Sequence, residues 1–162
     1  MRTNASRSEE EIERIISTYG DLLFRTALVM LGSREDAEDV LQETVLKYLQ
    51  KAPAFSGPKH EKAWLIKVAA NQCRDALRFR RRHPQISLEE WRGSGTCAEN
   101  SGILDALAGV PEKYRIVLLL YYVEEYSMGE IAAVIGRSVS AVKMRLKKGR
   151  ELLEEEYRKG DA

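Results

Sequence analysis

Apolar side chains recur every three or four residues along most of the chain, and this spacing predicts amphipathic helices. In the first half of the chain it predicts three of them. The first begins with a capping box at Ser8, and the second begins at Ser33 and ends before Pro53. The third spans about residues 61–82, after a proline-containing loop at residues 53–62.

The apolar residues of these helices identify the expected core of the first part. On the first helix they are Ile12, Ile15, Ile16, Tyr19, Leu22, Leu23, Ala27 and Met30. On the second and third helices they are Ala37, Val40, Leu41, Val45, Tyr48, Leu49, Trp64, Leu65, Val68, Ala69, Ala76 and Phe79. We expect all of these side chains to face inward.

The segment 83–101 is rich in glycine and serine and has no sustained helical spacing, so it is predicted to be a flexible linker. Beyond it lies the nearly all-apolar segment 112–124, which is expected to form one helix buried on several sides. No alternation typical of strands occurs. The predicted fold class is all-α, with a three-helix domain at 1–82 and a four-helix domain at 102–162.

The segment 127–146 has the spacing of a helix-turn-helix. Ser127 and Glu130 cap its first helix, Gly136 marks the turn, and Val142 and Leu146 pack the second helix back onto the first. Basic side chains point outward from that second helix, as in helices that enter the major groove: Lys143, Arg145, Lys147, Lys148 and Arg150. The alternative is an ordinary helical corner with a solvated basic face.

Charge is distributed unevenly along the 162 residues. The 26 basic and 25 acidic residues nearly cancel, with a net charge of +1. Segment 35–43 is acidic, whereas segments 67–82 and 137–150 are basic. Two separated basic segments indicate contact with phosphates at two separate places.

Asp39, Gln42 and Glu43 share one face of the second helix, opposite its apolar stripe. Such a polar stripe is by default a solvated surface, and acidic residues near a helix start also interact favourably with its dipole. Binding of a partner is the alternative interpretation.

Phe55 in the loop and Asn71 before the arginines offer a second possible site. An exposed aromatic ring beside amide and guanidinium groups is suited to stacking on an unpaired base. By local chemistry alone, Phe55 fits better as a plug of the helical core.

Several other classes of protein are disfavoured. The only cysteines, Cys73 and Cys97, and the only histidines, His60 and His83, are too scattered for a metal site, so no cofactor or metal is expected. The longest apolar run, 116–123, is too short to span a bilayer, which favours a cytoplasmic protein. No phosphate-binding glycine loop and no nucleophile with a base is present, so neither an enzyme nor a small-molecule substrate is expected.

Together these motifs resemble the extracytoplasmic-function sigma factors of bacterial RNA polymerase. The resemblance covers about residues 10–157 and depends on segments 36–43, 64–71 and 110–117, on Phe55, and on the helix-turn-helix. It implies that residues 1–82 are region 2, which binds the polymerase clamp and melts the -10 element. Residues 102–162 are then region 4, which reads the -35 element and touches the polymerase flap.

The resemblance also assigns roles to residues. Asp39, Gln42 and Glu43 correspond to clamp-binding residues, which raises their stripe to an expected interface. Phe55 corresponds to the pocket for a flipped non-template base, and Asn71 to a base contact. Around them, Arg74 and Arg78 are expected to hold the melted strand. The residues that meet the -35 duplex are Lys143, Met144, Arg145, Lys147 and Lys148.

Some residues depart from the family pattern. Arg137 follows Gly136 where an apolar residue is usual, and Met144 replaces a small polar one. Gly149 replaces a common alanine, at a helix cost of about 1 kcal/mol. The promoter sequence therefore cannot be taken from relatives.

The expected partners are core RNA polymerase, promoter DNA and an anti-sigma factor, which in this family is often membrane-bound. Because the chain ends soon after the recognition helix, no additional regulatory domain is expected. The alternative function is a conventional DNA-binding regulator, with residues 1–82 as a dimerisation or sensing module.

Overall fold

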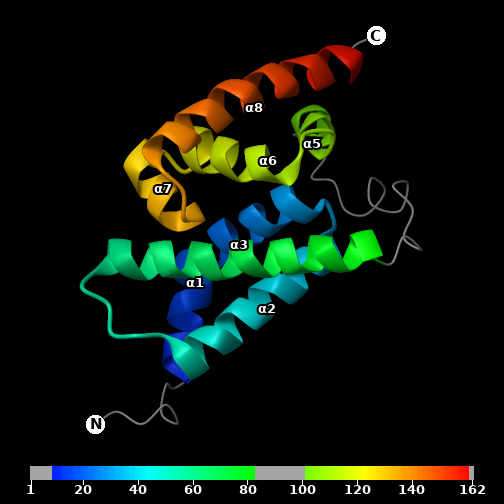
Figure 1. The fold of residues 1–162 in the computed structure, drawn as a ribbon. Helices are drawn as coiled ribbons and strands as arrows, with labels where there is room; N and C mark the ends of the chain where they lie inside the picture. Colours follow the sequence, from blue (N-terminus) through cyan, green and yellow to red (C-terminus); the bar gives the residue numbers. More distant parts are fainter. Residues whose placement is uncertain (1–8, 83–100, 161–162) are drawn as a thin grey trace.

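The computed structural model describes residues 9–82 and 101–160, with side chains from residue 105 onward in the second range. Within these ranges every regular element is helical (Figure 1). The predicted all-α fold class is confirmed. The predicted linker lies outside the described residues except for Ser101, where a helix begins. Among the described residues, no helix combines the length and apolar character needed to cross a bilayer.

Three helices pack together in the first part of the chain: α1 (Glu9–Leu31), α2 (Arg34–Lys51) and α3 (Pro58–Arg82). Large apolar side chains of this unit are completely buried, among them Ile15, Leu23, Met30, Leu65 and Ile66. The predicted three-helix core is therefore present.

The predicted boundaries of α2 are confirmed. The Ser33 side chain accepts a hydrogen bond from the backbone N–H of Asp36, at 3.3 Å. At the other end, Ala52 adopts an extended conformation immediately before Pro53. The capping box predicted at Ser8 lies outside the described residues.

Helix α3 begins at Pro58, whereas the apolar spacing predicted a start near residue 61. Proline is well suited to the first helical position because its missing N–H is not needed there. The backbone N–H of Glu61 donates to the carbonyl of Gly57, at 3.2 Å, which closes the first turn. The loop before α3 is therefore limited to residues 52–57.

Two residues predicted to face the core lie at the surface. Ile16 is 48% exposed and Phe79 is 59% exposed. Consecutive helical residues point about 100° apart, so Ile16 turns outward when its neighbour Ile15 is buried. Phe79 follows the buried Cys73 by six residues, which places it on another side of α3. Both predictions were wrong.

The second part of the chain forms another helical unit, composed of α5 (Ser101–Ala108), α6 (Glu112–Leu118), the π-helical turn η2 (Leu119–Val123), α7 (Met128–Ile135) and α8 (Val139–Gly160). The single helix predicted at 112–124 is thus only partly correct. In η2 the backbone N–H of Glu124 donates to the carbonyl of Leu119, five residues earlier, at 3.1 Å. The widened turn leaves Tyr122 and Val123 more than half exposed, at 51% and 56%.

Helices α7 and α8 form the predicted helix-turn-helix. Ser127 and Glu130 make the reciprocal hydrogen bonds of a capping box at 3.1 and 3.2 Å. Gly136 ends α7 with a φ of 69°, a left-handed conformation that residues with a Cβ rarely adopt. Val142 and Leu146 are buried, as predicted.

The two helical units lie against each other. Helix α1 contacts α5 and α6, and α3 contacts α7, as the ribbon view also suggests (Figure 1). The buried apolar residues of both units form one continuous cluster. The described parts of the chain therefore form a closed arrangement of two domains.

Candidate functional site

Most of the predicted duplex-reading residues share the outer face of α8. Lys143, Lys147 and Lys148 are exposed, and Met144 is 73% exposed. The opposite face of the helix is buried and carries Val142, Leu146 and Gly149. The helix therefore presents a row of cations while its other side holds it on the domain.

Arg145 lies apart from these lysines. It is half-buried, and the pKa of its guanidinium is lowered by burial and by the charges of Arg137 and Arg74. Arg74 belongs to α3, so this flank of α8 is turned toward the first unit. The structure thus brings the lysines of α8 together but not Arg145.

A hollow of about 320 Å³ adjoins the outer face of α8. Its lining residues are Tyr121, Met128, Lys143, Met144, Leu146, Lys147 and Arg150. Beside it, Nη1 of Arg150 donates a hydrogen bond to the Tyr122 hydroxyl at 3.1 Å. The hollow combines an apolar base with a cationic rim.

The predicted acidic face of α2 is also present. Asp39, Gln42 and Glu43 are all exposed, while Ala37 and Val40 are buried on the other side of the helix. Within the described residues, no ion pair engages Asp39 or Glu43. Their negative charges are therefore available to a partner.

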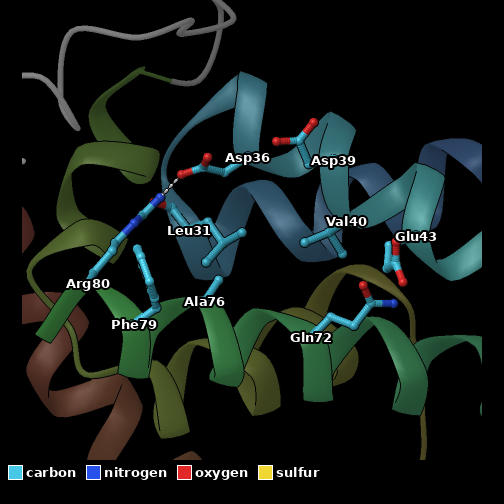
Figure 2. A pocket seen from close by; sticks show the side chains of 9 residues that line it. All are labelled: Leu31, Asp36, Asp39, Val40, Glu43, Gln72, Ala76, Phe79 and Arg80. Carbon is cyan, nitrogen blue, oxygen red and sulfur yellow. Dashed lines mark hydrogen bonds and ion pairs between the residues drawn. The ribbon is translucent and has the colours of Figure 1, made fainter. Parts of the chain in front are cut away.

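A groove of about 410 Å³ runs beside this face, between α2 and α3 (Figure 2). Asp39 and Glu43 line its α2 side, and Gln72 and Phe79 line its α3 side. Arg80 closes one end by pairing with Asp36 and by donating to the Leu31 carbonyl at 2.8 Å. The apolar spacing had placed Phe79 in the core and so missed the groove.

Phe55 is half-buried in the loop that precedes α3. Its ring stacks on Tyr48, with centroids 6.1 Å apart and an interplanar angle of 15°. Trp64 and His60 approach it edge-on, at 5.8 and 5.2 Å. Phe55 is thus packed against the core on one side and partly open to solvent. This position combines the two alternatives from the sequence, a plug of the helical core and an exposed ring that can stack on a base.

Three of the predicted strand-binding residues, Asn71, Arg74 and Arg78, share one face of α3 with Lys67. Lys67, Asn71, Arg74 and Arg78 follow one another by four, three and four residues, which aligns them along the helix. Nη1 of Arg74 donates to Oδ1 of Asn71 at 3.2 Å. Within the part of the chain that the structure describes, no hydrogen bond occupies the amide nitrogen of Asn71, so it can donate to a ligand.

Beneath the loop lies a buried carboxylate that the apolar pattern did not reveal. Arg14 donates to both carboxylate oxygens of Glu61, at 2.9 and 3.0 Å. The hydroxyls of Tyr19 and Tyr48 also donate to it, at 3.0 and 2.9 Å. The hydrogen bonds from Arg14 hold the pKa of Glu61 below its ordinary value, against the opposing effect of burial. Glu61 therefore fixes the first turn of α3.

Charged contacts connect the two units. Arg25 of α1 pairs with Glu124 at 2.9 Å, and Arg81 of α3 pairs with Glu112. In each pair the first unit supplies the cation and the second supplies the acid. Such partly exposed pairs are individually weak, so apolar packing carries most of the contact.

No group of histidine, cysteine and acidic side chains suited to a metal ion occurs among the described residues. Cys73 is buried, which raises the pKa of its thiol to about 12. The thiol is therefore not a reactive group at neutral pH.

The sigma-70 region 2 family model matches residues 15–83, and the sigma-70 region 4 model matches residues 101–153. The ECF RNA polymerase sigma factor SigW of Bacillus subtilis is 28% identical over 165 residues, covering 89% of this chain and 87% of SigW. The RNA polymerase sigma factor CarQ of Myxococcus xanthus is 32% identical over 127 residues, covering 74% of this chain and 73% of CarQ. The chain belongs to the ECF sigma factors of the sigma-70 family.

Two solved structures share the fold of this sigma factor. One is the sigma factor RpoE in complex with the anti-sigma factor NepR from Bartonella quintana, with a TM-score of 0.72, 21% identity, and coverage of 92% of this chain and 98% of RpoE. The other is CnrH in complex with the cytosolic domain of CnrY, with a TM-score of 0.69, 23% identity, and coverage of 94% and 90%.

The resemblance inferred from the motifs is confirmed. The sigma factor directs transcription initiation by RNA polymerase and is not an enzyme. The helix-turn-helix of its second unit is the DNA-binding element of region 4.

Proposed function

We propose that residues 1–82 act as region 2, residues 102–162 as region 4, and residues 83–101 as the linker between them. Region 2 binds core polymerase and melts the -10 element, and region 4 reads the -35 element. The observation that supports this division of roles is that one chain carries separate charged surfaces. An acidic face on α2 is distinct from the cationic faces of α3 and α8.

Region 4 reads the duplex through α8. Lys143, Met144, Arg145, Lys147 and Lys148 are the proposed contacts, with base edges read by Arg145 and phosphates bound by the lysines. The exposed row of lysines and the rigid turn before it support this role.

Region 2 binds the polymerase clamp through Asp39, Gln42 and Glu43. Their exposure opposite the buried stripe of α2 supports this role, because charge on such a face is not needed for folding. The neighbouring groove extends the surface to Phe79, where an apolar side chain of the clamp can be received.

The -10 strand is captured by Phe55, Asn71, Arg74 and Arg78. Stacking on an aromatic ring contributes about 1 to 3 kcal/mol, which must offset a comparable cost of unstacking. The cationic face of α3 supplies phosphate contacts, and the amide of Asn71 supplies a hydrogen bond to the base.

The exposed Tyr122 and Val123 support a contact between region 4 and the polymerase flap. RpoE and CnrH are each found with a partner, the anti-sigma factor NepR and the cytosolic domain of CnrY. We therefore include an anti-sigma factor, membrane-bound in many members of this family, as a partner of this chain. The sigma factor itself acts in the cytoplasm, where it binds the polymerase.

Run-off transcription with purified core polymerase over a promoter library tests the function. We expect transcripts only when the sigma factor is added, from promoters that share two separated elements. Phe55→Ala and Asn71→Ala should then depress permanganate-reactive opening at the selected promoter while affinity for core polymerase is unchanged. Duplex binding without transcription would favour a conventional DNA-binding regulator.

A further inference from the structure

The loop at residues 52–57 carries Phe55, and one side-chain hydrogen bond to this loop comes from α3. His60, in the first turn of α3, is exposed and turns back toward the loop. Its Nδ1 accepts a hydrogen bond from the backbone N–H of Ser56 at 3.1 Å. The Ser56 hydroxyl oxygen lies 3.4 Å from the same nitrogen, so Ser56 approaches Nδ1 with both its backbone and its side chain. As acceptor from the N–H, Nδ1 is the unprotonated nitrogen of the ring.

The hydrogen bond between Ser56 and His60 resembles a capping motif that is common at the starts of helices. The Glu61 N–H bonds to the Gly57 carbonyl, so Gly57 caps α3 and His60 is the third residue of the helix. A side chain at this position often reaches back to accept from the backbone before the helix. In this chain the accepted N–H belongs to the residue directly after Phe55.

Phe55 is thereby held from two sides. On the buried side its ring stacks on Tyr48, whose hydroxyl donates to Glu61 at 2.9 Å. On the solvent side the His60 ring stands at 89° to the Phe55 ring, 5.2 Å away. The adjacent residues His60 and Glu61 therefore both act on one aromatic ring, His60 directly and Glu61 through Tyr48. Glu61 has a structural role in the core, whereas His60 is exposed and not needed to fill it.

We propose that His60 is a positioning residue for capture of the unpaired promoter base. By accepting the hydrogen bond from Ser56 it fixes the loop and holds Phe55 where the base stacks. Without this bond, the exposed end of the loop samples other conformations, and the strand must order it on binding. The inference rests on the proposed role of Phe55 in base capture.

Three substitutions separate the contributions of the side chain. His60→Gln keeps a hydrogen-bond acceptor at a helix position that favours glutamine, His60→Phe keeps an aromatic ring without an acceptor, and His60→Ala removes both. Ser56→Ala removes the hydroxyl, which lies 3.4 Å from His60 Nδ1, but leaves the backbone N–H, so it separates the side-chain contact from the backbone hydrogen bond. The probe is a single-stranded oligonucleotide with the non-template -10 sequence of the selected promoter, titrated against reconstituted holoenzyme.

We expect His60→Ala and His60→Phe to weaken oligonucleotide binding about three- to ten-fold, the effect of losing one hydrogen bond. His60→Gln and Ser56→Ala should bind within about two-fold of the original protein, and affinity for core polymerase should not change in any variant. Unchanged binding by His60→Ala or His60→Phe would overturn the inference. So would a glutamine variant as weak as the alanine variant.

A double substitution tests whether His60 acts through Phe55. In a Phe55→Ala background, His60→Ala should weaken binding by less than about two-fold, since the two residues belong to one unit. Fully additive losses would contradict the inference. If Phe55→Ala alone binds the oligonucleotide normally, base capture itself is wrong. If it binds weakly while His60→Ala binds normally, only the role of His60 is wrong.

Discussion

Arg115 of α6 donates a hydrogen bond from Nη1 to the carbonyl oxygen of Val29 in the last turn of α1, at 3.2 Å. Carbonyls at this end of a helix have no partner within the helix, and positive charge is favourable beside them. Arg115 is only 5% exposed, and burial lowers the pKa of its guanidinium to about 10. A buried cation from region 4 thus caps a helix of region 2.

Replacing Arg115 with alanine should destabilise the closed arrangement. Loss of a buried hydrogen bond made by a charged group costs about 1.5 to 3 kcal/mol, so the free energy of unfolding should fall by that amount in urea titrations. Arg158→Ala is the matched control, because Arg158 pairs with Glu154 on the exposed surface of α8. It should change stability by less than about 0.5 kcal/mol. Equal stability of the two variants would contradict the capping role.

Glu61 should make stability depend on pH in the acid range. Hydrogen bonds from Arg14 keep the pKa of Glu61 below its ordinary value of 4.5. The carboxylate therefore contributes stability above that value and loses the contribution as the pH falls through its lowered pKa. The difference in unfolding free energy between the original protein and Glu61→Gln should shrink steadily below this pH. For the exposed Glu10, the same substitution should change the unfolding free energy by less than about 0.5 kcal/mol.

Charge reversal on α2 should separate polymerase binding from folding. Asp39→Arg with Glu43→Arg should weaken binding to core polymerase, measured by titration of labelled sigma factor, while the melting temperature barely changes. Phe79→Ala should also weaken it, because Phe79 lines the same groove and is 59% exposed. Glu13→Arg, a matched reversal on the exposed face of α1, should bind normally. Unaltered affinity of the double variant would remove this face from the interface.

Two residues of α8 should differ in how they affect promoter binding. Arg145→Ala should relax preference at one promoter position, since a side chain bidentate to a base discriminates by about 1 to 3 kcal/mol. Lys148→Ala should weaken all sequences alike and reduce the salt slope of holoenzyme binding by about 0.9. Identical profiles of the two variants over a promoter library would refute this division.

The sequence predicted helices well where a local cap defines them, as at Ser33 and Ser127. The prediction that Phe79 faces the core was wrong, because burial depends on the neighbouring helices. Phe79 falls outside the stripe of α3 that packs against α1 and α2. The partners of Glu61 are far away in the chain, on other helices, and no local spacing indicates them. The acidic stripe, in contrast, follows directly from the helical periodicity of α2.

Gly149 is unfavourable for the helix itself but allows close packing between two helices. The chain pattern identified it only as a poor helix residue. In the structure it is buried, and a Cβ at this position would lie 3.3 Å from Leu118 and from the Cβ of Tyr114. The glycine therefore allows α8 to pack closely on α6, which propensity alone could not reveal.

The turn at Gly136 and the buried face of α8 have an evolutionary consequence. The angle of the reading helix is set by one glycine and by Val142, Leu146 and Gly149, none of which belongs to its exposed face. Surface substitutions away from such features usually change stability by less than about 0.5 kcal/mol. Promoter preference can therefore diverge by exchange of residues outside this buried set, without loss of the fold that holds the reading helix.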